Sequence, residues 1–247
     1  MATGASDQRP AAGDGDVGDA YARPAVTVDV VVLTLAAGRL QVLLIERGAE
    51  PFVGRPALPG GFLRVGDDDK GGESLDEAAA RELLEETGLS ADSVLLEQLG
   101  VFGAPGRDPR GRTITVAFIA LVRPELAAFV RGGSDAAAAA FVDVDDAKDL
   151  AFDHDLILCR ALERLRDDVK RGAPVAFHLA PDPFTIRELQ DVHEALLHEP
   201  GAPPVAQGAG AFRKRFDRLL EEGKVERVEG KRVTGKRPAM VFRAVVV

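Results

Sequence analysis

The amino-acid sequence predicts an α/β fold for most of the chain, followed by a smaller module of helices and a β-hairpin. Runs of β-branched residues alternate with segments whose apolar residues recur at helical spacing. Capping residues mark the ends of several helices. The length of 247 residues, with 46% hydrophobic content, suffices for one large and one small domain.

We expect four segments along the chain. Residues 1–24 form a disordered tail, because the first twenty are mostly Gly, Ala and Asp and contain no apolar run. A larger domain spans 25–173, a linker spans 174–183, and a smaller domain spans 184–247. No segment holds eighteen consecutive apolar residues, so we expect no membrane partner and a cytoplasmic protein.

The larger domain opens with two predicted strands. Residues 26–35 and 40–47 are rich in Val, Leu and Ile, and a turn at Gly38 separates them, which is typical of paired strands. A Pro- and Gly-rich bend follows at 56–62, and an acidic loop follows at 66–72. Further strands are expected at 94–102, at 113–122 and near 140–144.

Two helices of this domain have clearly marked ends. The first begins at Ser74, which forms a capping box with Glu77, and Gly88 ends it. The second is predicted over 155–171 and stops at Gly172. Both helices carry apolar residues along one side, so we expect each to pack against the strands.

The sequence contains one cysteine, Cys159, which lies in the second of these helices. A single cysteine excludes an internal disulfide and any metal site built from cysteines. Because Leu158 and Leu162 are its neighbours, we expect its thiol to be buried in the core.

The smaller domain begins with a second capping box, Thr185 and Glu188. Its expected elements, in chain order, are a helix at 184–197, a Pro- and Gly-rich loop at 199–210, a helix at 211–222 and a hairpin that turns at Gly230 and Gly235. Helix, loop, basic helix and hairpin is the order of a small winged helix-turn-helix domain.

Charge is distributed unevenly along the chain. The formal net charge is −9, yet residues 212–243 hold eleven Lys and Arg against five acids, so the remaining chain carries about −15. This asymmetry suggests an acidic, metal-using body joined to a basic end that binds a polyanion.

The basic end supplies eight candidate DNA contacts, which would meet phosphates and base edges from a recognition helix and a wing. They are Arg213, Lys214, Arg215 and Arg218 in the helix and Lys231, Arg232, Lys236 and Arg237 in the hairpin. We expect double-stranded DNA as a partner and a homodimer that binds a palindromic operator. The alternative is a winged helix kept for dimerisation or protein contact, with its charges merely solvated.

Three carboxylates of the first helix are candidate metal ligands. Glu82, Glu85 and Glu86 stand at i, i+3 and i+4, which places them on one helical face. Like charges at this spacing repel by roughly 0.2–0.5 kcal/mol per pair. Clustered oxygen ligands suit Mg²⁺ or Mn²⁺, which would activate a water for attack on phosphorus. A solvated acidic helix face is the simpler alternative.

The wider sequence around these glutamates resembles the Nudix box of nucleoside-diphosphate hydrolases, G-x5-E-x7-R-E-U-x-E-E-x-G-U, where U is apolar. Glu73 to Leu89 read E-x7-R-E-L-x-E-E-x-G-L, and Gly60 and Gly61 precede Phe62 upstream. The resemblance implies an α/β/α sandwich with a mixed sheet. It also implies roles for five residues: Glu82, Glu85 and Glu86 as metal ligands, Arg81 as the residue that orients a glutamate, and Glu73 as an auxiliary carboxylate.

The chain departs from the box at one place. Eleven residues instead of five separate Gly61 from Glu73, so the acidic loop at 66–72 contains a six-residue insertion. The insertion lies at the entrance to the helix, and the resemblance alone therefore does not fix where Glu73 lies.

Other segments resemble a narrower group, the ADP-ribose-directed Nudix proteins and the NAD-related transcriptional regulators (NrtR) built from them. The matching segments are 26–34, 57–65, 106–112, 150–158, 184–197 and 236–243. The resemblance implies ADP-ribose or a similar NAD-derived nucleotide as the ligand. Pro56 and Phe141 stand where the group often has Trp, so an aromatic contact to the base is expected to be absent.

Six residues are candidates for binding this ligand: Arg107, Arg110, Arg112, Gly60, Gly61 and His154. The three arginines can cradle a diphosphate or ribose through their forked donors. A flexible basic surface loop is the alternative for the arginines, and a purely structural role is the alternative for His154.

The leading hypothesis is a transcriptional regulator that binds ADP-ribose or a related metabolite and DNA, and that retains Mg²⁺-dependent hydrolysis of a diphosphate. The rival is an ADP-ribose pyrophosphatase that releases AMP and ribose 5-phosphate, with the winged helix as an accessory. A third reading is a hydrolase of another nucleoside diphosphate, because the box defines a reaction class and leaves the base open.

Overall fold

The computed structural model describes residues 23–66, 71–128, 130, 139–203, 205–233 and 238–245. Its larger sheet has the strand order β3-β2-β1-β6-β5, with β4 paired to β1 and β7 paired to β2. The strands are β1 (Ala25–Ala36), β2 (Arg39–Glu46), β3 (Pro56–Ala57), β4 (Gly60–Phe62), β5 (Leu95–Phe102), β6 (Thr113–Leu121) and β7 (Ala139–Asp143). Since β1 is parallel to β6 and antiparallel to β2, the sheet is mixed.

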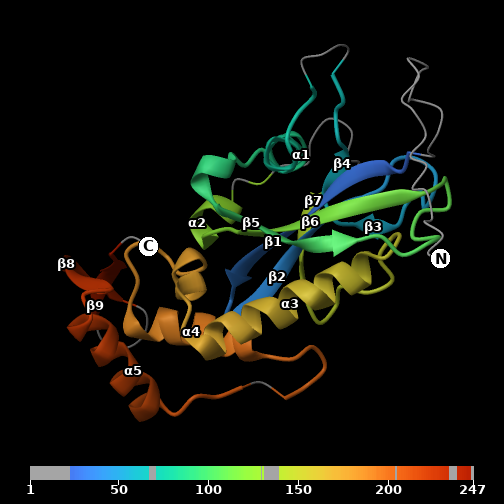
Figure 1. The fold of residues 1–247 in the computed structure, drawn as a ribbon. Helices are drawn as coiled ribbons and strands as arrows, with labels where there is room; N and C mark the ends of the chain where they lie inside the picture. The colour runs from blue at the N-terminus through green and yellow to red at the C-terminus, as the bar shows by residue number, and fades with distance from the viewer. Residues whose placement is uncertain are drawn as a thin grey trace, which may run out of the picture.

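Helices cover both faces of this sheet (Figure 1). Along β1, Val30 and Val32 pack on the side of α1 (Leu75–Thr87), whereas Val31 and Leu33 pack on the side of α3 (His154–Arg171). The alternation follows from the strand period of two, because successive side chains point to opposite faces. The predicted α/β/α sandwich is therefore confirmed. Two short elements, η2 (Ala91–Ser93) and α2 (Pro124–Ala127), complete the domain.

The helix ends lie where the capping residues predict. Ser74 and Glu77 form the capping box of α1, and Gly88 closes that helix. Thr185 and Glu188 form the same motif at α4 (Ile186–Leu197). These boxes satisfy backbone N–H groups that otherwise lack partners in the first turn, so both starts are determined locally by sequence.

The winged helix begins with α4. It continues with α5 (Ala209–Glu221) and the antiparallel pair β8 (Val225–Val233) and β9 (Pro238–Ala244), with Phe184 bridged to Phe242 of β9. The predicted turn at Gly230 is wrong, because Gly230 lies inside β8 where the pairing register shifts. The other predicted turn residue, Gly235, lies outside the described residues.

The segment expected to be a linker is packed. Residues 174–178 form η3 (Pro174–His178), and Val175, Ala176 and Phe177 are buried. One apolar cluster continues from the large sheet through α3 and η3 to Phe212 and Phe216 of α5. The larger domain and the winged helix thus share a core, while the exact domain boundaries remain predictions.

Two further expectations, for Cys159 and for the N-terminal tail, can be compared with the structure. Cys159 is exposed, so the expectation of a buried thiol is wrong: it lies on the outward side of α3, next to Arg160. The expected tail, residues 1–24, lies outside the described residues except for Arg23 and Pro24. No helix among the described residues is long and apolar enough to cross a membrane.

Candidate functional site: the carboxylate helix and the adjoining pocket

Arg81 in α1 holds the carboxylate cluster together. Its Nε and Nη2 donate to the two oxygens of Glu73 at 2.8 and 2.6 Å. Its Nη1 donates to Glu82 Oε1 at 2.5 Å and to Glu85 Oε2 at 3.1 Å. The rigid fork of a guanidinium group suits this bidentate arrangement. The hydrogen bond to Glu73 raises the pKa of Arg81 against the effect of burial, so the side chain stays charged.

The six-residue insertion does not displace Glu73. The Glu73 N–H donates to the Arg64 carbonyl at 3.0 Å, and the Arg64 N–H donates to Glu73 Oε1 at 2.8 Å. We call these two bonds the Arg64–Glu73 clasp. Gly72 permits the clasp, because a Cβ there would overlap the Arg64 carbonyl. Glu73 therefore reaches Arg81 although eleven residues separate it from Gly61.

The two glycines of β4 lie directly against the carboxylates. The Gly60 N–H donates to Glu86 Oε2 at 2.9 Å. Glu82 occupies the space that a Cβ on Gly61 would need, so only glycine lets this carboxylate approach the strand. The strand itself is fixed by its pairing with β1. The predicted Gly60 and Gly61 therefore shape the end of the site nearest α1.

The carboxylates of the cluster differ in pKa, because burial dominates at two of them and the hydrogen bond from Arg81 dominates at a third. Burial raises the pKa of Glu86 to about 7, and neighbouring carboxylates contribute in the same direction. Burial also raises the pKa of Glu82, which is only 7% exposed. By contrast, the hydrogen bond from Arg81 lowers the pKa of Glu73 to about 2. Negative charge is therefore crowded at Glu82 and Glu86, which a bound cation would relieve.

The predicted metal ligands share one face of α1 but do not converge on a point. Within the described residues, no three His, Cys, Asp or Glu side chains are placed to hold a metal ion. Arg81 binds one oxygen of Glu82, and Glu85 is held between Arg81 and Arg64, whose Nη2 lies 3.0 Å from Glu85 Oε1. The carboxylate donors fit Mg²⁺ or Mn²⁺ chemically. Glu85 would have to exchange a guanidinium group for the cation.

A pocket of about 530 Å³ opens beside Glu86. A volume of this size suits a ligand as large as a nucleotide. Five of the six predicted binding residues line it: Gly60, Gly61, Arg107, Arg110 and His154. Arg112 does not, because its Nη1 donates to the Gly103 carbonyl at 2.8 Å and its side chain lies away from the pocket. The prediction for Arg112 is therefore not supported by its position.

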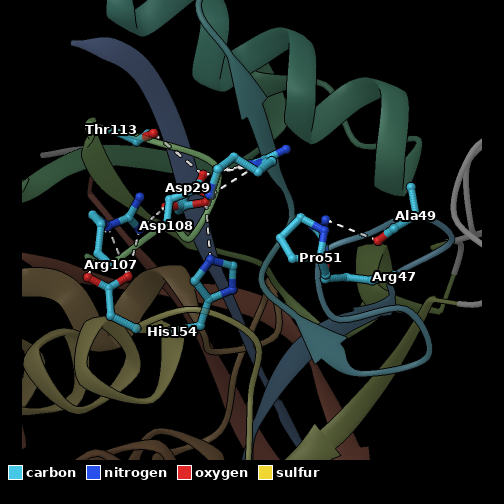
Figure 2. Close-up of polar contacts among 10 residues, drawn as sticks. Asp29, Arg47, Ala49, Pro51, Arg107, Asp108, Thr113 and His154 are labelled. Atoms are coloured by element: carbon cyan, nitrogen blue, oxygen red, sulfur yellow. Dashed lines mark hydrogen bonds and ion pairs between the residues drawn. The ribbon is translucent and has the colours of Figure 1, made fainter.

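A buried polar network centres on Asp29 of β1, as Figure 2 shows. Asp29 Oδ2 accepts from Arg107 Nη2 at 3.3 Å, and Asp29 Oδ1 lies 3.4 Å from His154 Nε2. Arg107 also donates to both oxygens of Asp153, with the shortest bond at 2.6 Å. The Leu58 N–H donates to His154 Nδ1 at 2.9 Å, which leaves the proton of a neutral ring on Nε2, facing Asp29.

This network changes the expected role of Arg107. Its side chain is 4% exposed, and its donors are engaged by Asp29 and Asp153. It therefore joins the loop at 103–112 to the start of α3. Arg107 shapes the wall of the pocket, while Arg110 is better placed to meet a ligand because its side chain is 43% exposed.

The pocket residues Arg47 and Asp108 were not singled out by the sequence analysis. Arg47 at the end of β2 lies 4.6 Å above the Phe152 ring, and Arg110 lies 5.1 Å from the Phe62 ring. Asp108 binds Arg110 with bonds as short as 2.7 Å. Phe62 and Phe152 line the pocket with aromatic rings, although Pro56 and Phe141 stand where the group often has Trp. One sequence feature could have indicated this pocket: Asp29 is the only charged residue of β1, whose other residues are apolar or threonine.

The eight predicted DNA contacts fall into four groups, of which Arg215 forms the last. Arg213, Lys214 and Arg218 are exposed on α5, and Lys231 is exposed on β8. Arg232 is half-buried and donates to Glu188 Oε1 at 2.9 Å. Two more, Lys236 and Arg237, lie outside the described residues. The exposed cations of α5 thus share the surface of one helix, as a recognition helix requires.

Arg215 does not belong to this exposed group. Its Nη2 donates to the carbonyl of Val169 in the last turns of α3, at 3.1 Å. Burial lowers its pKa, and it lines a small cavity together with His193 and Leu219. The expectation that Arg215 contacts DNA does not fit this inward position.

The fold and the site together define a Nudix domain followed by a DNA-binding winged helix. The model of the NUDIX domain matches residues 23–161, and that of the NrtR DNA-binding winged helix domain matches residues 176–244. The chain belongs to the Nudix family, within its NrtR group.

Three known proteins illustrate the similarity. The chain is 35% identical to the ADPR (ADP-ribose) responsive transcriptional repressor NtrR of Acinetobacter baylyi, over 90% of this chain and 83% of that protein. It resembles the crystal structure of Shewanella oneidensis NrtR complexed with a 27mer DNA, with a TM-score of 0.70, 32% identity and coverage of 89% and 93%. It is 41% identical to the ADP-ribose pyrophosphatase of Methanocaldococcus jannaschii, over 56% of this chain and 73% of that enzyme.

Proposed function

We propose that this protein is a transcriptional regulator that binds ADP-ribose, or a related NAD-derived nucleotide, in the pocket beside Glu86 and binds double-stranded DNA through its winged helix. The observation that carries the proposal is the pocket itself. Its lining combines the Glu86 carboxylate and the backbone of Gly60 and Gly61 with Arg47, Arg110 and Phe152. A diphosphate flanked by a base and a sugar has the matching chemistry.

Different lining residues of the pocket suit different parts of such a ligand. Arg47 and Arg110 carry charge that attracts a diphosphate. Phe62 and Phe152 offer faces on which a base can stack. Gly60 and Gly61, which line the pocket, let β4 lie against Asp29 and the α1 carboxylate Glu82, because a Cβ at either position would overlap protein atoms there. The repressor of Acinetobacter baylyi, which is ADPR responsive by name, supports this choice of ligand.

The proposal includes retained hydrolysis with Mg²⁺ or Mn²⁺. Nudix hydrolases use a divalent metal, and Glu82, Glu85 and Glu86 would hold it here. A bound cation would supply Lewis acidity toward a phosphoryl oxygen and an activated water. Arg81 holds Glu82 and Glu85 of α1 together with Glu73, which precedes that helix. With water added across the diphosphate, ADP-ribose would yield AMP and ribose 5-phosphate.

The DNA surface consists of the exposed cations of α5 and β8, namely Arg213, Lys214, Arg218 and Lys231, together with Arg232, Lys236 and Arg237 of the sequence prediction. Phosphate contacts of this kind give affinity and salt dependence, while base contacts give sequence preference. A homodimer would place two such helices on a palindromic operator. The similarity to a DNA-bound NrtR structure supports the partner.

Binding of the full-length chain tests the proposal. ADP-ribose is titrated by calorimetry without metal, with AMP and ribose 5-phosphate as comparison ligands. DNA binding is measured by fluorescence anisotropy on a duplex that the wild-type chain selects from a random pool, with and without ADP-ribose. We expect ADP-ribose to bind and to shift DNA affinity by about tenfold. Selection of no duplex at low salt, or no effect of ADP-ribose on the selected one, would overturn the proposal.

A second candidate is an ADP-ribose pyrophosphatase in which the winged helix is an accessory. The observation that favours it is the intact cluster around Arg81, which survives the insertion through the Arg64–Glu73 clasp. Rapid Mg²⁺-dependent hydrolysis of ADP-ribose without sequence-selective DNA binding would favour this reading. In either case, a Glu85→Gln, Glu86→Gln double variant that hydrolyses as fast as wild type would refute the assigned site.

A further inference from the structure

The helix α3 joins the ligand pocket to the winged helix. Figure 1 shows it running along one face of the sheet toward α4. Its first residue, His154, lines the pocket, and the preceding Asp153 is held there by Arg107. His154 and Val169 are fifteen residue steps apart at about 1.5 Å per step, which is about 22 Å along the helix axis. A rigid helix of this length transmits a displacement at one end to the other.

The far end of α3 is tied to the winged helix by two hydrogen bonds. Arg215 of α5 donates to the Val169 carbonyl at 3.1 Å, and Arg166 donates to the His198 carbonyl, next to α4, at 3.1 Å. The Val169 carbonyl also accepts from the N–H of the C-cap residue Gly172 at 3.1 Å, and a carbonyl oxygen has a second lone pair that the Arg215 guanidinium group can occupy.

The tie through Arg215 acts on the helix that carries the exposed cations. Arg215 stands directly after Lys214 and three residues before Arg218, but unlike these exposed cations it is partly buried and directs its guanidinium group to α3. Phe212 and Phe216 anchor the inner side of α5 in the shared apolar core. A shift of the α3 end would therefore turn α5 as a unit and re-aim its outer side.

We propose that Arg215 is the residue through which ligand binding in the pocket is coupled to the orientation of α5, rather than a DNA contact. The inference rests on the proposed function, because it requires both a ligand and DNA. It is a positioning role: Arg215 touches neither partner, and it sets how far a change at His154 and Asp153 reaches the recognition helix. A ligand shifts this equilibrium only if it binds the two orientations differently.

The experiment compares full-length Arg215→Ala, Arg215→Lys and Arg218→Ala with wild type, on the selected duplex described above. We expect Arg215→Ala to bind ADP-ribose and DNA within about threefold of wild type, while the roughly tenfold effect of ADP-ribose on DNA affinity falls below about twofold. Arg215→Lys, which retains a donor, should restore part of the effect. Arg218→Ala, the matched exposed control, should weaken DNA binding and keep the effect.

A second readout does not depend on DNA. Hydrogen exchange of residues 209–221 should change on adding ADP-ribose to wild type and Arg218→Ala, and should not change in Arg215→Ala. If Arg215→Ala loses DNA affinity by tenfold or more while the ADP-ribose effect persists, Arg215 is a DNA contact and the inference is wrong. If wild type itself shows no ADP-ribose effect on DNA or on exchange, the proposed function fails instead. Equal thermal melting of the three variants excludes unfolding as the cause.

Discussion

Two histidines of this protein are equally buried and yet occupy opposite kinds of environment. His154 in the ligand pocket and His193 at the winged-helix junction are each 3% exposed. His154 accepts a backbone N–H at Nδ1 and faces Asp29 with Nε2. His193 Nδ1 has no hydrogen-bond partner among the described residues, and its neighbours are Phe212 and the cation Arg215.

The difference shows that buried polar side chains are paired with hydrogen-bond partners in the pocket, whereas a buried imidazole at the junction lacks such a partner among the described residues. In the pocket, every charged side chain of the Asp29 network has an opposite charge within hydrogen-bonding distance. At the junction, a neutral imidazole is surrounded by apolar rings and one cation. Removing one partner of a charged pair in the pocket should therefore lower the stability of the protein strongly. At the junction, stability should instead fall when the pH is lowered.

Breaking the paired side of the comparison should have the largest effect. Arg107→Ala leaves the Asp29 and Asp153 carboxylates without their buried cation, which should cost about 3–5 kcal/mol of unfolding free energy. Urea unfolding at neutral pH measures it. Arg160→Ala is the control, because Arg160 and its partner Glu163 are 59% and 46% exposed, so that loss of this pair should cost less than about 1 kcal/mol. Equal losses for the two variants would contradict the assigned network.

Acid should test the unpaired side. Burial, and then the charge of Arg215, lowers the pKa of His193 from 6.5 to about 4. The unfolded chain therefore takes up a proton at higher pH than the folded chain does. The stability is fully present above about pH 6.5 and falls as the pH drops toward 4, by about 3 kcal/mol in total.

Urea unfolding between pH 7 and pH 4 measures this effect in wild type and in His193→Phe. The variant removes the titrating ring while keeping an aromatic side chain beside Phe212, so its pH dependence should be shallower by that amount. A His193→Phe profile parallel to the wild-type profile would show that other groups carry the acid response.

The smallest expected effect concerns an exposed ion pair. Arg64 and Glu85 contact each other at 3.0 Å with side chains 63% and 47% exposed. Such pairs contribute about 0.2–1 kcal/mol. Arg64→Ala should free Oε1 of Glu85, while Arg81 still holds Oε2, and should raise Mn²⁺ affinity by about two- to fivefold, as read by electron paramagnetic resonance of free Mn²⁺. Arg39→Ala, which removes an exposed arginine away from α1, should leave Mn²⁺ binding unchanged.

Much of the fold could be predicted because its determinants are local. The capping boxes at Ser74 and Thr185 lie within four residues of the helices that they start, and the alternation of β1 is a property of one strand. The order of elements in the winged helix is likewise written in a short stretch of sequence.

The candidate site divides along the same line. The cluster of Arg81 and the α1 glutamates lies within one helix, so its spacing predicts its shape. The contacts of Arg107 join residues 46 and 78 positions away, at Asp153 and Asp29, and no local pattern contains them. The predicted DNA contact of Arg215 does not fit the structure for a different reason. A run of cations does not reveal which member turns inward, since that depends on the carbonyl of Val169 in another domain.

The Arg64–Glu73 clasp has a consequence for how such sequences are recognised. It closes the inserted segment at its two ends, so the box depends on a distance in space between Gly61 and Glu73 and not on the number of residues between them. A search pattern that fixes this gap at five positions would pass over the chain, although its carboxylates and Arg81 are assembled. The length of that loop is therefore a variable that family patterns should leave open.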